Sequence, residues 1–550
     1  MDVLEIAKIL YEMGDLLELT EDNPYRARAY YRGAQVLQEN PECQVEDRAS
    51  LLELPGIGES LAGVITVLAR TGRSEHYEEL KRQVPAGLRK LLHVPGIGPK
   101  TARLILRELK PASLAELLQA IEEKQVRKIK GLSSKIEAKL KQGLKMLEER
   151  SNYFSLGVAL PFGREVVSFL EKLPGVNSAA IVGSTIRGRE IVRDLDLLVG
   201  CEDPEKVISS FLSFPKIEQR VTVEENHVSA LTWFGLLVDL YLVPPEAYSD
   251  ALEHFSGDVG HHIKLRELAV RKELEWNIIP KDAYRNLGLP TLPPELREAE
   301  ADLTLPDNLL DLQDIRGDLH MHTRWSDGGF SIKEMAKAAL GKGYEYIAIC
   351  DHTRNLSIAN GLKPERLEEQ RREIEQVNGE MAGQIKVLAG TEADILKDGS
   401  LDFPDEVLRE LDVVVASVHL RYKQNIDEIT ERIELALKNP HVDILAHPTG
   451  RLIMKRDPYD LHLERVFEQA AKNNKALEIN ASPSRLDLKD KHAAMARDLG
   501  IPIVIDTDAH SIEDLNDMEY GVMTARRAAL EAGDVLNTKS LTEMEKWLKR

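Results

Sequence analysis

The chain has 550 residues and a formal net charge of −20, and because one hydrophobic core seldom organises so long a chain, we expect several domains. No apolar run approaches the ~20 residues that cross a bilayer, which argues against a membrane-spanning protein. The first residues are acidic where a secretory signal is basic, which argues against a secreted protein, so we expect a cytoplasmic one. Three widely separated cysteines exclude a disulfide framework and a thiolate zinc site, so any metal must be bound by histidines and carboxylates.

The net charge is unevenly divided along the chain. Residues 51–150 contain 19 Lys and Arg against 12 Asp and Glu, a local charge of +7 that leaves −27 for the other residues. Such a basic stretch attracts a phosphate backbone. The sequence therefore predicts a nucleic-acid-binding segment here, with surface carboxylates or metal ligands elsewhere.

The first third of the chain has the spacing of amphipathic helices. Apolar residues recur every three or four positions in 3–19 and in 25–38. An internal repeat follows, because "LLELPGIGESLAGVI" (51–65) recurs as "LLHVPGIGPKTARLI" (91–105) and more weakly as "KIKGLSSKIEAKL" (128–140). Each copy predicts two helices joined by a tight turn.

The turns of the two strong copies resemble the helix-hairpin-helix motif, which binds the DNA backbone without reading sequence. Glycines permit a turn whose backbone N–H groups can bind phosphate beside a helix N-terminus. One copy would suit an ordinary αα-hairpin equally well, but two copies in a basic stretch favour DNA. A dinucleotide-binding loop is excluded because no strand precedes either turn. The expected DNA-binding residues are Gly56, Gly58, Gly96, Gly98 and Lys100.

From about residue 150 the pattern changes to mixed α/β. The expected strands lie within 178–188, 193–200, 219–225 and 236–244, with a helix at 163–173. A stretch rich in Pro, Leu and acidic residues, from about 285 to 314, then predicts a linker.

The last part of the chain alternates strands and helices regularly. Its seven apolar runs are "GDLHMH", "YIAICDH", "IKVLAGTE", "LDVVVASVH", "VDILAH", "ALEIN" and "IPIVIDTDAH". Alternating strands and helices predict parallel βαβ units that close toward a barrel. Every run ends in a polar residue, and the carboxyl ends of barrel strands converge, so we expect one shared pocket there.

Two carboxylates in the middle region predict a metal site. Asp194 and Asp196 leave the same face of one strand and repel each other, and Asp239 lies in another apolar strand. Upstream, the turn at 183–190 offers groups for phosphate oxygens. Three carboxylates beside such a turn suit phosphoryl transfer with two Mg²⁺ ions, whereas an isolated Asp-x-Asp would more often be a solvated edge strand.

These residues resemble the palm of the family X DNA polymerases. The resemblance implies that Asp194, Asp196 and Asp239 are catalytic and bind Mg²⁺, and that Arg164, Ser184 and Arg187 contact the incoming nucleotide. "HFSG" is similar to the family's Tyr-Phe-Thr-Gly segment and departs from it at His254, a position that bears on the rejection of ribonucleotides. The implied nucleotide-binding residues are Arg164, Gly183, Ser184, Arg187, His254, Phe255 and Gly257.

Six of the seven C-terminal runs end in candidate metal ligands, which make nine together with Asp327, five residues beyond the first run. One histidine at a strand end is more often a hydrogen-bonded core residue, but nine such groups are too many for chance. Imidazole and carboxylate without thiolate suit Mn²⁺, Zn²⁺ or Fe²⁺, and nine ligands exceed the needs of one ion, so we expect two or three ions. The ligands are His320, His322, Asp327, His352, Glu392, His419, His447, Asp508 and His510.

This ligand set resembles the PHP (polymerase and histidinol phosphatase) domain, a distorted (β/α)7 barrel that hydrolyses phosphoesters. The order of the two resemblances along the chain is that of bacterial family X polymerases. It implies a helical domain with helix-hairpin-helix motifs (1–148), a nucleotidyltransferase palm and thumb (149–290), a linker (291–314) and a PHP phosphoesterase domain (315–550).

The resulting hypothesis is a monomeric DNA polymerase that fills short gaps in base excision repair, using gapped or primer-template DNA and dNTPs. Its PHP domain would add a Mn²⁺-dependent 3'-5' exonuclease, with abasic-site endonuclease or 3'-phosphatase activity in some relatives. Two alternatives are a DNA-bound PHP phosphoesterase with a degenerate polymerase core and a polymerase whose PHP domain is structural. The complete aspartate triad and the complete set of nine ligands argue against them.

Overall fold

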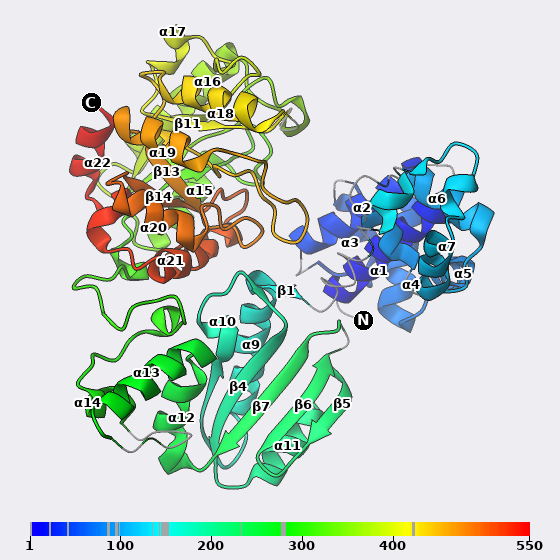
Figure 1. Cartoon of the computed structure of the whole chain (residues 1–550). Coiled ribbons are helices and arrows are strands. Elements are labelled where there is room, and N and C mark those ends of the chain that lie inside the picture. Colours follow the sequence, from blue (N-terminus) through cyan, green and yellow to red (C-terminus); the bar gives the residue numbers. More distant parts are fainter. Residues whose placement is uncertain are drawn as a thin grey trace. The chain divides into compact units, whose positions relative to one another are not determined.

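The computed structural model describes residues 3–20, 24–40, 43–54, 56–84, 88–93, 97, 99–134, 136–141, 144, 153–232, 234–274, 276, 282–420 and 424–549. The chain forms two compact units, residues 1–152 (unit 1) and residues 153–550 (unit 2). Unit 1 is helical, whereas unit 2 contains two large β-sheets (Figure 1). Within the described residues, no helix is long and apolar enough to cross a bilayer.

Unit 1 is built from short amphipathic helices around one apolar core, as predicted. Its buried residues recur with helical spacing, for example Ile6, Leu10 and Leu17 against Ala34 and Leu37. The helices are α1 (Val3–Thr20), α2 (Pro24–Glu39), α3 (Arg48–Glu53), α4 (Glu59–Thr71), α5 (Glu75–Gln83), α6 (Pro99–Leu109) and α7 (Leu114–Glu122).

The first repeat forms the predicted helix–turn–helix, with α3 and α4 joined by the turn that contains Gly56. The φ of Gly56 is +106°, and a Cβ there would lie 2.5 Å from Nε of Arg32, so only glycine suits the position. Gly58 is the N-cap of α4. In the second repeat, Gly96 and Gly98 lie outside the described residues, and Lys100 is exposed in the first turn of α6.

The first half of unit 2 contains a five-stranded sheet in the order β2-β4-β7-β6-β5. β4 and β7 are parallel and the other neighbours are antiparallel. The four predicted strands are present, but the sequence analysis missed β6, a short run between two predicted strands. The strands are β2 (Val176–Val182), β4 (Asp194–Cys201), β5 (Ile217–Val223), β6 (His227–Thr232) and β7 (Leu237–Val243).

Helices cover this sheet and extend from its edge. α9 begins seven residues before the predicted start, at Leu156, and buries Leu160 and Val166 against Leu195 and Leu197 of β4. The covering and following helices are α9 (Leu156–Leu170), α11 (Pro204–Leu212), α12 (Tyr248–Phe255), α13 (Val259–Arg271) and α14 (Ala283–Leu287), and the short α10 (Gly183–Ile186) follows β2.

The second half of unit 2 is a nearly closed barrel of seven parallel strands, which confirms the predicted barrel. The strands pair in chain order, and the backbone N–H of His322 beyond β8 donates to the carbonyl of Ala509 beyond β14 at 2.8 Å. They are β8 (Gly317–Met321), β9 (Tyr346–Ile349), β10 (Lys386–Asp394), β11 (Val413–Ser417), β12 (Ile444–Leu445), β13 (Ala476–Asn480) and β14 (Ile503–Asp506).

Helices surround the barrel and close one of its ends (Figure 1). Met544 and Trp547 of the last helix belong to the same buried cluster as the inner strand residues Tyr346 and Val415. This helix therefore covers the end where the strands begin and leaves the carboxyl ends to the site. The helices are α15 (Ile332–Gly341), α16 (Pro364–Glu380), α17 (Asp405–Leu408), α18 (Ile426–Leu437), α19 (Leu463–Lys472), α20 (Asp490–Asp498), α21 (Met518–Arg527) and α22 (Leu541–Leu548).

The predicted linker is packed rather than extended through solvent. Leu292 and Leu296 join a buried cluster with Tyr284, and Arg297 and Glu298 are also buried. Residues 294–300 therefore form part of the contact between the two halves of unit 2.

We predict that Gly317→Ala destabilises the barrel. Gly317 is the first residue of β8, which carries the candidate ligand His320, and a Cβ there would lie 2.6 Å from the carbonyl oxygen of Tyr346. We expect a loss of about 2 kcal/mol in a thermal melt followed by circular dichroism. Gly341→Ala in α15, where no heavy atom of the described residues lies within 4 Å of the added Cβ, should keep or raise the melting temperature. Equal melting temperatures for the two variants would contradict this account of β8.

Candidate catalytic and metal-binding sites

The three candidate catalytic aspartates lie on two neighbouring parallel strands. Asp196 of β4 pairs in register with Asp239 of β7, and Asp194 lies two residues before Asp196 on the same face. Gly183, at φ +65°, begins the turn beside them, where any Cβ would overlap the Asp196 carboxylate. The strand register and this glycine together place three carboxylates beside one tight turn, at the amino ends of the two parallel strands.

The triad is electrostatically strained without a cation. Burial, followed by repulsion from Asp194 and Asp239, raises the pKa of Asp196 to about 7. Burial and Asp239 raise the pKa of Asp194 as well. Each carboxylate makes the ionisation of its neighbours less favourable, and a divalent cation between them would relieve this repulsion. The three residues therefore form a donor set that suits divalent cations, with Asp194, Asp196 and Asp239 as the oxygen ligands.

Two side chains that the sequence analysis did not identify hold Asp239. Nε2 of His227 lies 2.9 Å from Oδ1 of Asp239, and the hydroxyl of Ser229 donates to the same oxygen. Both residues come from β6, where Ser229 is the register partner of Asp239. The only sequence pattern that indicated these two residues was the alternation of His227 and Ser229 in the missed strand.

A pocket of about 380 Å³ adjoins the triad. Six of the seven predicted nucleotide-binding residues line it together with Asp194 and Asp196, and Asp258, Val259 and His262 complete the wall. The ring of Phe255 stacks on Tyr241 with centroids 4.6 Å apart. The six are Gly183, Ser184, Arg187, His254, Phe255 and Gly257.

His254, the position that departs from the family's tyrosine, is an uncharged imidazole. Burial, followed by the neighbouring His262, lowers the pKa of His254 to about 4. The two rings stack with centroids 4.3 Å apart, and Nδ1 of His254 is buried without a hydrogen-bond partner among the described residues. The wall of the pocket at this position therefore offers a flat neutral ring.

The seventh predicted nucleotide-binding residue, Arg164, is not among the residues that line this pocket. Its guanidinium instead donates two hydrogen bonds to the carboxylate of Glu519 in α21, at 2.8 and 2.7 Å. Arg187 does line the pocket, and its Nε donates to Oε1 of Glu298 at 3.1 Å. Both predicted triphosphate-binding arginines are thus paired with acids from outside the five-stranded sheet.

The nine predicted ligands of the barrel lie together at the carboxyl ends of its strands. Their donor atoms form three overlapping groups, which share His322 and His352, and Nε2 of His447 lies 3.0 Å from Oε1 of Glu392. The groups are His322, Asp327, His352 and His510; His320, His322 and Asp508; and His352, Glu392 and His419. Three overlapping groups fit a cluster of divalent cations better than a single ion.

Outer partners orient several of these imidazoles. Nδ1 of His320 lies 2.6 Å from Oε1 of Glu478, and Nδ1 of His419 lies 2.8 Å from Oδ1 of Asp394. A carboxylate on Nδ1 directs Nε2 of the same ring toward the cluster, which is how metal-binding histidines are usually held. Sequence analysis missed both acids: Glu478 lies within the run 476–480, and Asp394 lies two residues beyond the run 385–392, at the end of β10.

Protonation differs among the imidazoles of the cluster. Burial, followed by repulsion from His510 and His352, lowers the pKa of His322 to about 3, so its ring is neutral. Against the effect of burial, neighbouring carboxylates raise the pKa of His419 to about 10 and that of His510 to about 9, so cations that bind there must displace protons. Nδ1 of His322 is buried without a hydrogen-bond partner among the described residues and is available to a cation.

One thiol lies below this cluster without joining it. Cys350 follows β9, is fully buried, and donates from Sγ to the carbonyl of Leu319 at 3.2 Å. Burial raises the pKa of its thiol well above the usual range. Cys350 is thus a core residue and not a ligand.

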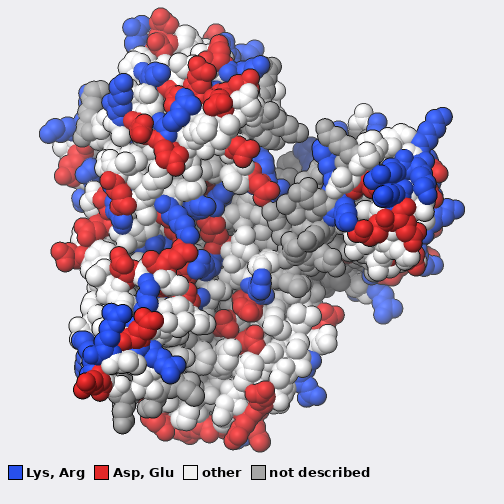
Figure 2. Space-filling view, viewed as in Figure 1, with Lys and Arg blue, Asp and Glu red and all other residues white. Residues whose placement is uncertain are grey.

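Basic side chains cover part of unit 1, where the DNA-binding residues were predicted. Figure 2 shows Lys and Arg at several places on the visible face of unit 1, beside a smaller acidic group. Of the predicted residues in the described parts, Gly56, Gly58 and Lys100 are exposed. These positions leave the turn of the first repeat and the start of α6 accessible to a phosphate backbone.

Comparisons with known proteins cover all parts of the chain. A helix-hairpin-helix domain model matches residues 1–74, a SAM-like helix-hairpin-helix tandem model matches residues 88–146, and a PHP domain model matches residues 318–482. The chain is 38% identical over 566 residues to the DNA polymerase/3'-5' exonuclease PolX of Bacillus subtilis (strain 168), with 99% of each chain covered.

Other relatives match less than half of the chain. A protein named "Probable phosphatase" from Thermoanaerobacter sp. (strain X514) is 30% identical over 240 residues, which cover 40% of this chain and 89% of that protein. A second, from Acetivibrio thermocellus, is 30% identical over 243 residues, 42% of this chain and 95% of that protein.

We predict that Asp196→Asn stabilises the cation-free protein at alkaline pH. The native pKa of Asp196 is about 7 against an ordinary value of 3.8, so its ionisation costs native stability as the pH rises from about 4 through 7. At about pH 8 the variant should therefore unfold at a higher temperature than the parent, with a free energy of unfolding that is larger by about 2 kcal/mol. Below pH 4 the two proteins should differ little.

The same melts should be repeated with Mg²⁺. The cation should raise the melting temperature of the parent more than that of Asp196→Asn, because the variant has lost one ligand and the repulsion that the ion relieves. Exposed Asp307, far along the chain from the triad, gives the matched Asp307→Asn control. A pH-independent difference between Asp196→Asn and the parent would show that the triad is not strained.

Proposed function

Because the chain belongs to the family X DNA polymerases that carry a PHP domain, we propose that it extends DNA primers at the palm and hydrolyses DNA 3' ends in the barrel. The observation that carries the proposal is the presence of two separate ligand sets of different chemistry. One consists of three carboxylates beside a pocket, and the other of six imidazoles and three carboxylates at a barrel end.

At the palm, Asp194, Asp196 and Asp239 would bind two Mg²⁺ ions, which when bound activate the primer 3'-hydroxyl and neutralise charge on the phosphates. Asp239 accepts hydrogen bonds on Oδ1 and keeps Oδ2 for the reaction, since His227 and Ser229 both contact Oδ1. The two β6 residues therefore fix the carboxylate that lies nearest to the hydroxyl in this assignment.

The pocket beside the triad would hold a deoxynucleoside triphosphate. Ser184 and the backbone of the turn at Gly183 offer donors to phosphate oxygens, and Arg187 supplies a guanidinium. His254, Phe255 and Gly257 would border the sugar and base. The neutral ring of His254 stacked on His262 gives this part of the pocket a rigid wall.

At the barrel, the nine residues would hold two or three ions, with Mn²⁺ or Zn²⁺ as the expected metals, which when bound supply an activated water and polarise a phosphoester. Glu478 and Asp394 hold the rings of His320 and His419, so the ligands are oriented before the ions arrive. The residues thus provide a preformed phosphoesterase centre.

A second activity of the same centre is favoured by the relatives that match less than half of the chain. These proteins are named probable phosphatases, and a 3'-phosphate at a DNA end is the corresponding monoester. We therefore propose 3'-phosphate removal beside exonuclease activity, with cleavage at abasic sites as a further candidate. A degenerate polymerase core is less well supported, because its triad is complete and held by β6.

The substrates that unite these activities are gapped and primer-template DNA, which unit 1 would bind through the phosphate backbone. We propose gap filling of the base excision repair type, by a monomer, with trimming of 3' ends that cannot be extended. Such substrates place the protein in the cytoplasm with bacterial DNA.

We predict a separation of the two activities. Asp194→Ala with Asp196→Ala should reduce nucleotide addition by more than about 100-fold and leave Mn²⁺-dependent 3'-end hydrolysis intact. His320→Ala with His322→Ala should do the reverse. Primer extension and end digestion are measured on the same gapped substrate with each preparation.

Folding is controlled by thermal melts and by His462→Ala, since His462 is half exposed, pairs with Asp427 and is not a ligand. This variant should keep both activities. If a folded His320→Ala, His322→Ala protein digests 3' ends at the parent rate, the nuclease does not lie in the barrel.

We also predict that Lys100→Ala weakens binding of gapped DNA by a similar factor for unrelated sequences. Removing a lysine that contacts phosphate weakens the salt dependence of DNA binding, so the magnitude of the slope of log affinity against log salt should fall by about 1. Lys549→Ala at the end of α22, a lysine paired with Glu545, is the matched control. Fluorescence anisotropy of labelled DNA at several salt concentrations measures both. A loss confined to one sequence would contradict backbone binding.

A further inference from the structure

Glu298 is a buried carboxylate of the packed linker that contacts three arginines. It is 5% exposed. Its Oε1 accepts hydrogen bonds from Nε of Arg187 at 3.1 Å and from Nε of Arg189 at 2.6 Å, and its Oε2 accepts one from Arg527 at 2.9 Å. Arg187 and Arg189 come from the palm and Arg527 from α21 of the barrel, so one side chain joins both halves of unit 2.

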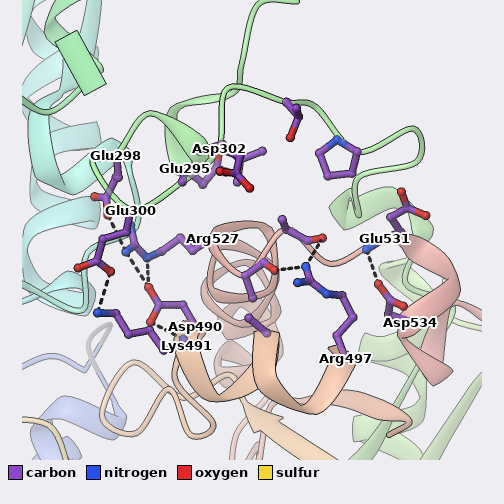
Figure 3. A pocket seen from close by; sticks show the side chains of 17 residues that line it. Glu295, Glu298, Glu300, Asp302, Asp490, Lys491, Arg497, Arg527, Glu531 and Asp534 are labelled. Atoms are coloured by element: carbon purple, nitrogen blue, oxygen red, sulfur yellow. Dashed lines mark hydrogen bonds and ion pairs between the residues drawn. The ribbon is translucent and has the colours of Figure 1, made fainter. Parts of the chain in front are cut away.

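This contact lies between two cavities. Arg187 lines the pocket of about 380 Å³ beside the aspartate triad. Glu298 and Arg527 line a second cavity of about 750 Å³, between the linker and helices α20 and α21 (Figure 3). The pair of Arg187 and Glu298 therefore connects the candidate nucleotide pocket to the contact between the palm and the barrel.

Arg527 fixes Arg187 in two ways. Besides its bond to Glu298, it donates from Nη1 to the backbone carbonyl of Arg187 at 2.9 Å. Its other nitrogens donate to Oδ2 of Asp490 in α20, at 2.7 and 3.0 Å (Figure 3). Because the guanidinium of Arg527 is held on the barrel side, both the backbone and the side chain of Arg187 are tied to the barrel.

Glu298 uses only part of the Arg187 guanidinium. It accepts from Nε, and Nη1 lies 3.4 Å from the carbonyl oxygen of Ser256, a long hydrogen bond beside the pocket. An arginine held through Nε keeps a defined direction while its outer nitrogens face a ligand. By contrast, Arg164 gives both terminal nitrogens to Glu519.

We propose that Glu298 is a positioning residue for nucleotide addition, which orients Arg187 toward the triphosphate and is itself held by Arg527 of the PHP domain. The inference rests on the proposed role of Arg187 as a triphosphate ligand. It gives the PHP domain a part in the polymerase reaction that is separate from its own hydrolytic site.

The loss of Glu298 has two opposing electrostatic effects. Removing a negative charge strengthens the field of Arg187 on a triphosphate, but it also leaves three guanidinium groups around one buried point. Arg187 is 8% exposed, so its charge is poorly screened from Arg527 there. Their repulsion, together with the loss of the Nε anchor, displaces Arg187, and we expect this second effect to dominate.

The test is insertion of one nucleotide into gapped DNA by full-length Glu298→Gln. The KM for the dNTP should rise about tenfold, with a smaller change in kcat, because the variant keeps the chemistry and loses the orientation of a ligand. Mn²⁺-dependent 3'-end hydrolysis should be unchanged, which shows that the barrel is folded. If hydrolysis is lost too, Glu298→Asp is tested in place of this variant, since it keeps the negative charge and shortens the side chain.

Glu300→Gln is the matched control. Glu300 lines the same cavity of the linker, and its carboxylate pairs with Lys491 at the surface, with 67% of its side chain exposed. Its KM for the dNTP should equal that of the parent. An equal rise in both variants would mean that the linker as a whole matters and would overturn the role of Glu298.

A double-mutant cycle shows whether Glu298 acts through Arg187. Arg187→Ala alone should raise the KM, and adding Glu298→Gln to it should cause little further change. Additive effects, or a KM for Glu298→Gln at or below that of the parent, overturn the positioning role and leave the proposed function intact. If Arg187→Ala itself leaves the KM unchanged, the assignment of Arg187 to the triphosphate fails, and the inference fails with it.

Discussion

Parallel strand pairing holds ionisable groups close together at two places in this chain, and the candidate sites depend on that constraint. In the palm, the register of β4 with β7 sets Asp196 against Asp239, and repulsion with burial raises the pKa of Asp196 to about 7. In the barrel, the converging strand ends bring eight of the nine predicted ligands into three overlapping groups, and His447 lies beside Glu392. The buried like charges of the palm oppose folding, whereas the barrel sets carboxylates beside imidazoles, and Glu392, against the effect of burial, raises the pKa of His419 to about 10. Bound cations would relieve the repulsion in the palm and would displace ring protons in the barrel.

The two sites also differ in their surroundings. The carboxylates of the palm lie beside a pocket, where water and a substrate can reach them. The barrel encloses its ligands, and Glu478 and Asp394 contact Nδ1 of the rings of His320 and His419. An open triad suits ions that arrive with a nucleotide, whereas an enclosed set suits ions that stay. The packed linker joins the two environments without merging them, because Glu298 and its arginines lie between.

Much of this arrangement is predictable from local patterns, and the remainder depends on contacts between distant segments. The spacing of His320 and His322 and the polar ends of the apolar runs were sufficient to predict the barrel and to select nine candidate ligands, which lie together in the structure. Asp-x-Asp beside Gly183 likewise indicated the triad. His227 and Ser229 were missed because a six-residue strand between stronger ones gives little signal. The partners of Arg164 and Arg187 could not be predicted, since Glu519 and Glu298 are far from them in sequence and ordinary acids in composition.

The burial of Cys350 has a consequence for oxidative conditions. Peroxide attacks the thiolate form of cysteine, and both Cys201 and Cys350 are buried thiols whose pKa is raised by that burial. Neither belongs to the carboxylate triad or to the imidazole cluster, and the ligand sets contain only oxygen and nitrogen donors. Oxidation of either thiol would therefore remove no predicted ligand from the two sites.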